Sequence, residues 1–328
     1  MPIGRVPIEK DSVISKMEGA NTGAIKTKEA KHADKSKAFE ISYSDPKYTF
    51  DDIILSEYVR EEIEDAISIF YYRELIFDEW KLSRVIKNKC NAFINLYGAS
   101  GTGKTMAANA IAHELKMKLL WVNYADIESK YVGETSKNIV YMFNEAEKNN
   151  AVILFDEADA LLSKRVTDMS SATDVSVNQT RSVLLHLLDN YNGIVVFTTN
   201  FIQNYDPAFM RRIPYHIKFD LPNEVFRKKL LLHYLKDTIP NSIDFDDVAK
   251  KYVGITGSDI ANAVMMSAVK IARKGSKELE QDVFEEALQN IIQSKKDNVG
   301  PSANFKVYER EVTEEYAMSQ IKKGGTDK

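Results

Sequence analysis

The sequence predicts an α/β protein, in which a parallel sheet with helices on both faces is followed by a small all-helical domain. Two observations indicate this fold. Apolar runs of strand length alternate with helix-periodic segments between residues 92 and 219, and no strand signal follows Leu221-Pro222. Alternation of strands and helices is typical of parallel sheets, because each crossover places a helix on a face of the sheet.

Composition and charge narrow the functional classes. The chain has 328 residues and a formal charge of −4, so we expect no general attraction to nucleic acid. Cys90 is the only cysteine, which excludes a disulfide within the chain and fits a reducing, cytoplasmic location. The longest apolar runs, such as 151–155, are too short to cross a bilayer, and the polar N-terminus predicts no signal or anchor.

The elements of the large domain follow in order. Residues 1–44 are predicted to be a flexible polar tail, and residues 45–221 the large domain. A helix from Glu57 to about Tyr72 carries an apolar face. Further helices are predicted at 105–116 and, mostly, at 127–149. The predicted strands are Ala92–Tyr97, Leu119–Asn123, Ala151–Phe155, Ile194–Thr198 and Ile217–Phe219.

Residues 222–295 are predicted to form the small helical domain. Asn223 can cap its first helix, which runs to about Leu235. Three more helices are expected at 246–252, 258–274 and 277–294. Residues 296–328 form a C-terminal extension whose sequence allows a short helix at about 312–322.

Residues 98–105 fit the pattern G-x-x-x-x-G-K-[ST] of a phosphate-binding loop, between a predicted strand and a predicted helix. Glycines let backbone N–H groups approach phosphate oxygens, and the helix N-terminus favours the negative charge. Lys104 would reach the β- and γ-phosphates, and the Thr105 hydroxyl would bind Mg²⁺. The nucleotide-binding residues predicted here are Gly98, Ala99, Ser100, Gly101, Thr102, Gly103, Lys104, Thr105 and Met106.

Polar side chains follow two later apolar strands of this domain, 151–155 and 194–198. Asp156 and Glu157 end the run 151–155, and this acidic pair lies 52 positions after Lys104. Asp156 would hold Mg²⁺, and Glu157 would take the proton of the attacking water. Asn200 follows a neighbouring strand and would orient that water. A strand followed by a helix cap, and a strand-end turn asparagine, are the alternatives that each residue alone would leave open.

Arg211 and Arg212 follow the turn that begins at Asp206-Pro207. Paired arginines after a turn are ordinarily solvated surface residues. In a nucleotide-binding protein they can instead act as arginine fingers, supplied in trans to the γ-phosphate of a neighbouring subunit. This interpretation requires an oligomer.

The motifs together resemble those of AAA+ ATPases of the original AAA clade, over about residues 45–295. The segments that carry the resemblance are 50–53 (Phe-Asp-Asp-Ile), 98–105, 156–157, 199–200 and 254–259 (Gly-Ile-Thr-Gly-Ser-Asp). The resemblance implies a P-loop NTPase domain with a helical lid, which binds ATP and Mg²⁺ at the subunit interfaces of a ring, usually a hexamer. It also implies that Ile53 and Ile54 line the adenine site, and that Gly257 and Ser258 close over the nucleotide.

Residues 129–134 (Ser-Lys-Tyr-Val-Gly-Glu) resemble the first pore loop of this clade. The resemblance implies that Lys130, Tyr131 and Val132 project into a central channel and that the aromatic ring grips unfolded polypeptide. An exposed tyrosine can contact any chain without sequence preference. A second pore loop is expected, with less support, within the polar stretch 165–179.

Two positions depart from the clade's usual pattern. The finger segment reads Arg211-Arg212-Ile213-Pro214-Tyr215, where many relatives have Arg-Pro-Gly-Arg-Phe, so the residue that contacts phosphate stays open. Many relatives also place a histidine against the adenine in the first lid helix. Here Tyr234 aligns with it, and His233 lies one residue earlier, so that contact is left unassigned.

We therefore expect an ATP-hydrolysing ring motor that unfolds, extracts or remodels proteins by threading polypeptide through its pore. Its expected partners are copies of itself and a protein substrate or adaptor, without nucleic acid or a membrane span. No H-E-x-x-H motif is present, so we expect no metalloprotease activity. The alternatives are an assembly switch controlled by the ATP state, or a remodeller that does not thread its folded partner.

Overall fold

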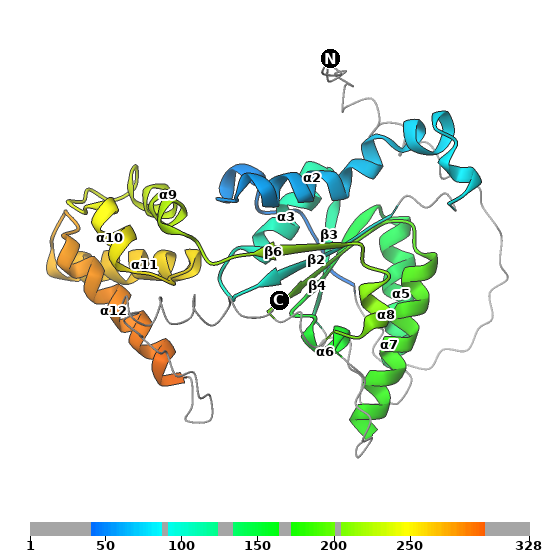
Figure 1. Cartoon of the computed structure of the whole chain (residues 1–328). Coiled ribbons are helices and arrows are strands. Elements are labelled where there is room, and N and C mark those ends of the chain that lie inside the picture. Colours follow the sequence, from blue (N-terminus) through cyan, green and yellow to red (C-terminus); the bar gives the residue numbers. More distant parts are fainter. Residues whose placement is uncertain (1–40, 87–90, 124–133, 164–171, 201–204, 299–328) are drawn as a thin grey trace, which may run out of the picture.

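The computed structural model describes residues 41–86, 91–123, 134–163, 172–200 and 205–298. Figure 1 shows an α/β domain and, beyond its strand β6, a separate group of helices. Most of both terminal segments, the first predicted pore loop with Lys130, Tyr131 and Val132, and much of the second lie outside the described residues.

A six-stranded sheet forms the centre of the large domain, in the order β1-β3-β4-β5-β2-β6. All of its pairings are parallel except that of β1 with β3, which is antiparallel. The strands are β1 (Tyr43–Ser44), β2 (Ala92–Gly98), β3 (Lys118–Asn123), β4 (Ala151–Asp156), β5 (Ile194–Thr199) and β6 (Tyr215–Phe219). The predicted fold class is confirmed, whereas the antiparallel strand β1 was not predicted.

The central strands are continuous apolar runs because both faces of the sheet are buried against apolar cores. In β4, Val152 and Leu154 pack into one core, while Ile153 and Phe155 pack into the other. The ring of Phe155 stacks on that of Phe197 in β5, with centroids 5.2 Å apart. Each face of the sheet therefore needs a covering layer of helices.

Helices supply both layers (Figure 1). On one face lie α2 (Glu57–Tyr71), which Ser56 caps through the N–H of Val59, and α3 (Lys104–Glu114). On the other face lie α5 (Glu134–Lys148) and α7 (Ala172–Asn190). The remaining short helical segments are η1 (Phe50–Asp52), η2 (Leu75–Glu79), η3 (Leu82–Arg84), α6 (Asp159–Leu162) and α8 (Pro207–Met210).

Four helices build the lid around a core of their own, with Leu231, Ile260 and Phe284 fully buried. Asn223 caps the first helix as expected, accepting a 3.0 Å hydrogen bond from the N–H of Phe226. The helices are α9 (Glu224–Leu235), α10 (Phe245–Lys251), α11 (Gly257–Lys274) and α12 (Gln281–Asn298). Among the described residues, no helix combines the length and the apolar character that crossing a bilayer requires.

The last lid helix differs from its predicted bounds. It was expected to begin at Lys277, but it begins at Gln281. The residues before it are used otherwise, because the Leu279 N–H donates to the carbonyl of Pro240 and the Leu279 carbonyl accepts from Ser242. This tertiary pairing cannot be seen in a helical periodicity.

Candidate functional site

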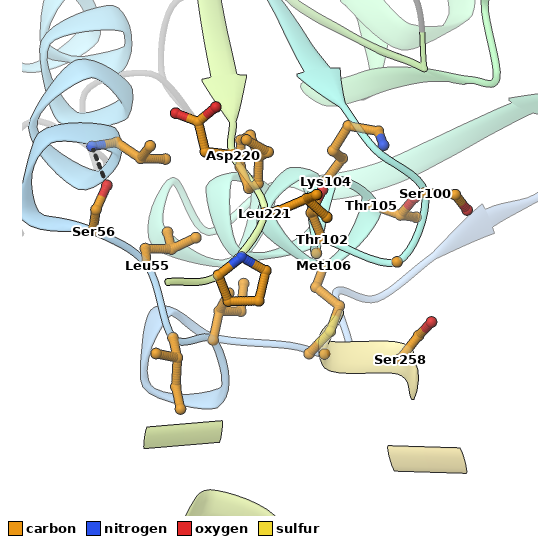
Figure 2. Close-up of a pocket in the computed structure, with 18 of the residues that line it drawn as sticks. Leu55, Ser56, Ser100, Thr102, Lys104, Thr105, Met106, Asp220, Leu221 and Ser258 are labelled. Carbon is orange, nitrogen blue, oxygen red and sulfur yellow. Dashed lines mark hydrogen bonds between the residues drawn. The ribbon is translucent and has the colours of Figure 1, made fainter. Parts of the chain in front are cut away.

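A cavity of about 810 Å³ lies between the phosphate-binding loop, the carboxyl ends of the parallel strands and the lid. This volume is within the range of ligand sites. In Figure 2, Lys104, Thr105 and Met106 lie on the loop and helix side, and Ser258 lies on the lid side. Most predicted site residues line the cavity, namely Ile53, Ile54, Ser100, Gly101, Thr102, Gly103, Lys104, Thr105, Met106, Asp156, Glu157, Asn200, Gly257 and Ser258.

Two glycines show why the loop needs this residue type. Gly98 has φ +145°, and a Cβ there would lie 2.1 Å from the carbonyl oxygen of Phe219. Gly101 has φ +78°, and a Cβ there would lie 2.4 Å from Ser258 Oγ. The Ser258 N–H also donates to the Gly101 carbonyl at 3.3 Å. The lid therefore contacts the phosphate-binding loop directly.

The Lys104 side chain is buried and held by three acceptors. Its Nζ donates to the carbonyls of Gly98 and Ala99, each at 2.8 Å, and to Asn200 Oδ1 at 3.1 Å. Burial lowers the pKa of Lys104, and the nearby carboxylates of Asp159, Asp156 and Glu157 oppose that shift. Gly98 and Ala99, which do not line the cavity, thus position this ammonium through their carbonyls.

Thr105 and Asp156 lie together, as a shared Mg²⁺ would require. Thr105 Oγ1 donates to Asp156 Oδ1 at 3.0 Å. A hydroxyl and a carboxylate are hard oxygen donors, and Mg²⁺ is commonly held by one or two such groups together with substrate phosphates and water. The residues present therefore fit this ion.

The backbone at Glu157 turns sharply into a left-handed conformation, with φ +52°. Such a conformation costs of order 1–3 kcal/mol for a residue other than glycine, so it needs support. Thr198 of β5 provides it. Its hydroxyl accepts from the Glu157 N–H at 3.1 Å and donates to Asp156 Oδ1, while its carbonyl accepts from the Ala158 N–H at 2.9 Å. The exposed Glu157 side chain is thereby directed into the cavity.

Sequence reasoning missed Thr198 and Asp159. Besides bonding Lys104, Asn200 donates its backbone N–H to the Asp159 carboxylate, at 3.3 Å and 3.4 Å to the two oxygens. Each missed residue lies two positions from a predicted site residue, Thr198 before Asn200 and Asp159 after Glu157, but no motif spacing distinguishes either of them.

Arg211 and Arg212 do not line the cavity of their own chain. Arg212 forms a two-pronged ion pair with Asp189 on α7, with distances of 2.8 Å and 2.9 Å, and also donates to the Ala208 carbonyl. The Asp189 carboxylate raises the pKa of Arg212. Arg211 is exposed, and its side chain makes no hydrogen bond or ion pair with any described residue. The two arginines are therefore not equivalent.

Part of the cavity wall is apolar and aromatic. Ile53, Ile54 and Leu230 line it, together with both His233 and Tyr234. The rings of His233 and Tyr234 meet edge to face with centroids 5.1 Å apart, and burial raises the pKa of Tyr234. This part of the wall suits a flat nucleobase, and both rings line the cavity that would hold it.

Comparison with known proteins shows the family to which the chain belongs. Residues 94–221 match the model of the ATPase family associated with various cellular activities (AAA). Cell division protein C of Sulfolobus acidocaldarius is 31% identical over 305 residues, which cover 89% of this chain and 77% of the relative. ATP-dependent zinc metalloprotease FtsH 1 of Conexibacter woesei is 30% identical, with 87% of this chain and 43% of the relative covered.

A third relative, the 26S proteasome regulatory subunit 8 homolog of Encephalitozoon cuniculi, is 34% identical over 60% of this chain and 52% of the relative. The chain therefore spans about half the length of the metalloprotease and of the proteasome subunit, and most of the length of cell division protein C. With a family match over the core of the large domain and a similar protein covered along most of its length, the chain belongs to the AAA family of ATPases.

Proposed function

We propose that this ATPase assembles into a ring, usually a hexamer in its clade, and uses hydrolysis to unfold, extract or remodel other proteins. The observation that carries the proposal is the position of Arg211. It is exposed, unpaired among the described residues, and outside the nucleotide cavity of its own chain. An arginine in such a position can reach a phosphate only in a neighbouring subunit.

The residues around the cavity have separable roles in hydrolysis. Lys104 and the loop backbone bind the β- and γ-phosphates. Thr105 and Asp156 would hold Mg²⁺, which would supply positive charge against the charge that develops on the phosphates. Glu157 accepts a proton from the attacking water, which Asn200 orients. Asn200 is suited to that role because its Oδ1 is bonded to Lys104 and its N–H to Asp159.

Arg211 would complete the site of a neighbour by stabilising charge on the transferred phosphoryl group. Arg212 is better suited to hold the arginine-bearing turn, since its guanidinium is already paired with Asp189. This division of roles makes Arg211 the main finger.

Protein remodelling is supported by the relatives, which include zinc metalloproteases named as ATP-dependent and proteasome regulatory subunits. Threading through a pore rests on the resemblance at Lys130, Tyr131 and Val132, which lie outside the described residues. A cytoplasmic location likewise stays a prediction.

The proposal is tested by measuring ATP hydrolysis and unfolding on the same variants. The probe is a folded fluorescent reporter with an unstructured tail. Tyr131→Ala should keep hydrolysis within about threefold of the parent and abolish unfolding, while Tyr131→Phe keeps both, because the ring face does the gripping. Unfolding by Tyr131→Ala at the parental rate would favour the non-threading remodeller or the switch.

Assembly is tested with the chemical variants. Arg211→Ala should bind ATP normally but hydrolyse it slowly, and parental activity per subunit should rise with protein concentration. Lys104→Ala, which should lose binding, and Glu157→Gln, which should bind without turnover, are the controls. Full activity of a monomer at every concentration would rule out the ring.

A further inference from the structure

A single amide lies in the middle of an otherwise apolar stretch of β2. Asn95 is fully buried, between Ile94 and Leu96, which are also fully buried. Burying a primary amide is costly unless its donor and acceptor are both bonded. Its presence at the centre of the sheet therefore calls for a specific reason.

Both ends of the Asn95 amide are bonded. Its Oδ1 accepts a hydrogen bond of 3.2 Å from the Tyr205 hydroxyl, and its Nδ2 lies 3.3 Å from Nδ1 of His216. An amide nitrogen is only a donor, so Nδ1 accepts in this arrangement, and the protonated Nε2 that this requires is buried with no hydrogen-bond partner among the described residues. Burial lowers the pKa of His216, which favours this neutral form.

The two partners bracket the segment that carries the arginines. Tyr205 immediately precedes Asp206, the N-cap of α8, and Arg211 and Arg212 follow that helix. His216 lies on β6, just after the arginine turn and directly opposite Asn95 in register. Asn95 therefore bonds to both the beginning and the end of this segment.

The same side chain is close to the nucleotide site in sequence and in space. Asn95 lies three positions before Gly98 on the strand that leads into the phosphate-binding loop. His216 also lines the nucleotide cavity. Packing reinforces the arrangement, because Phe209 and Ile213, on either side of the arginines, are completely buried.

We propose that Asn95 is a positioning residue, which aligns the Arg211 turn with the phosphate-binding strand of its own chain through Tyr205 and His216. Hydrolysis in the neighbouring subunit then depends on this buried amide, although Asn95 touches no nucleotide. The inference rests on the proposed role of Arg211 in trans.

The test is Asn95→Leu in the full chain, with a fluorescent ATP analogue for binding and steady-state hydrolysis for turnover. Leucine has a similar volume and keeps the strand apolar. We expect analogue affinity within about twofold of the parent and hydrolysis at saturating ATP lower by on the order of tenfold, as displaced catalytic groups produce. Adding Asn95→Leu to Arg211→Ala should cause no further loss, since both changes remove one function.

A matched pair at His216 keeps the test independent of the folding of Asn95→Leu. His216→Gln retains an acceptor for the Asn95 amide, so it should hydrolyse saturating ATP faster than His216→Leu, which has none. Ser267→Ala, which alters a buried hydroxyl in the lid, is the control and should leave both readouts unchanged.

The outcomes separate the inference from the proposed function. Equal losses of binding and hydrolysis in Asn95→Leu, additive losses with Arg211→Ala, or equal rates for the two His216 variants would overturn the inference. If Asn95→Leu hydrolyses ATP at the parental rate while Arg211→Ala hydrolyses it slowly, the inference is overturned and the proposed function stands. A parental rate in Arg211→Ala would remove the proposed function and the inference with it.

Discussion

Replacement of Gly101 by alanine should separate the lid from the phosphate-binding loop. Gly101 has φ +78°, and its added Cβ would lie 2.4 Å from Ser258 Oγ and 2.7 Å from Thr256 Oγ1. The first distance is about 1 Å below the 3.4 Å at which ordinary van der Waals contact begins. Thr256 cannot move away freely, because its hydroxyl and N–H both bond to the Asp259 carboxylate in a capping box.

Alanine substitutions at two other glycines separate the cost of backbone strain from the cost of lost lid contact in Gly101→Ala. A left-handed alanine costs about 1–2 kcal/mol wherever it lies, so Gly101→Ala, Gly103→Ala and Gly254→Ala share that term. Gly103 has φ +99° with its nearest neighbour at 3.8 Å, and Gly254 has φ +84° with nothing within 4 Å. Gly101→Ala alone also loses the Ser258-to-Gly101 hydrogen bond, worth about 1 kcal/mol, as the lid moves outward.

The assay is binding of a fluorescent ATP analogue, alongside the unfolding free energy of each variant. We expect similar losses of stability for Gly103→Ala and Gly254→Ala. Gly254→Ala should leave affinity unchanged, whereas Gly101→Ala should weaken it at least fivefold, which is about the factor that 1 kcal/mol gives. Ser258→Ala should partly restore the affinity of Gly101→Ala. Parental affinity in Gly101→Ala would refute the reasoning that lid contact sets the nucleotide site.

Three further predictions concern other residues. Thr198→Val should lower the hydrolysis rate by on the order of tenfold with near-normal ATP binding, because it removes the Thr198 hydroxyl bonds to the Asp156 carboxylate and the Glu157 N–H. Thr198→Ser should restore the rate, and equal rates for the two variants would contradict this prediction. Asp189→Ala should lower the free energy of unfolding by about 1 kcal/mol or less, since the ion pair of Asp189 with Arg212 is partly exposed. In the same ATPase assay, this variant should keep more activity than Arg211→Ala. Because burial lowers the pKa of His216, the unfolded chain binds a proton at this residue more readily than the folded chain does. His216 therefore contributes stability that is fully present above its ordinary pKa of 6.5 and is lost as the pH falls through the lowered pKa. In this pH range, denaturant unfolding of His216→Gln should depend less on pH than unfolding of the parent does.

The sequence by itself determined the fold class and most of the residues that line the cavity, because those features are local. The phosphate-binding loop, the acidic pair after β4 and the Asn223 cap each depend on short spacings, and the structure places their residues where the spacing required. The buried strands β4 and β5 could also be predicted from the sequence, since burial on both faces requires a continuous apolar run.

Only the tertiary structure decided which residues support these motifs. Thr198, Asp159 and Asn95 act through partners that are distant in the chain, so no local pattern marks them. The unequal arginines have the same cause, because Asp189, which holds Arg212 and leaves Arg211 exposed, lies on another helix. Periodicity and motif spacing report on neighbours along the chain, whereas hydrogen bonds and ion pairs between elements exist only after the sheet has brought those elements together.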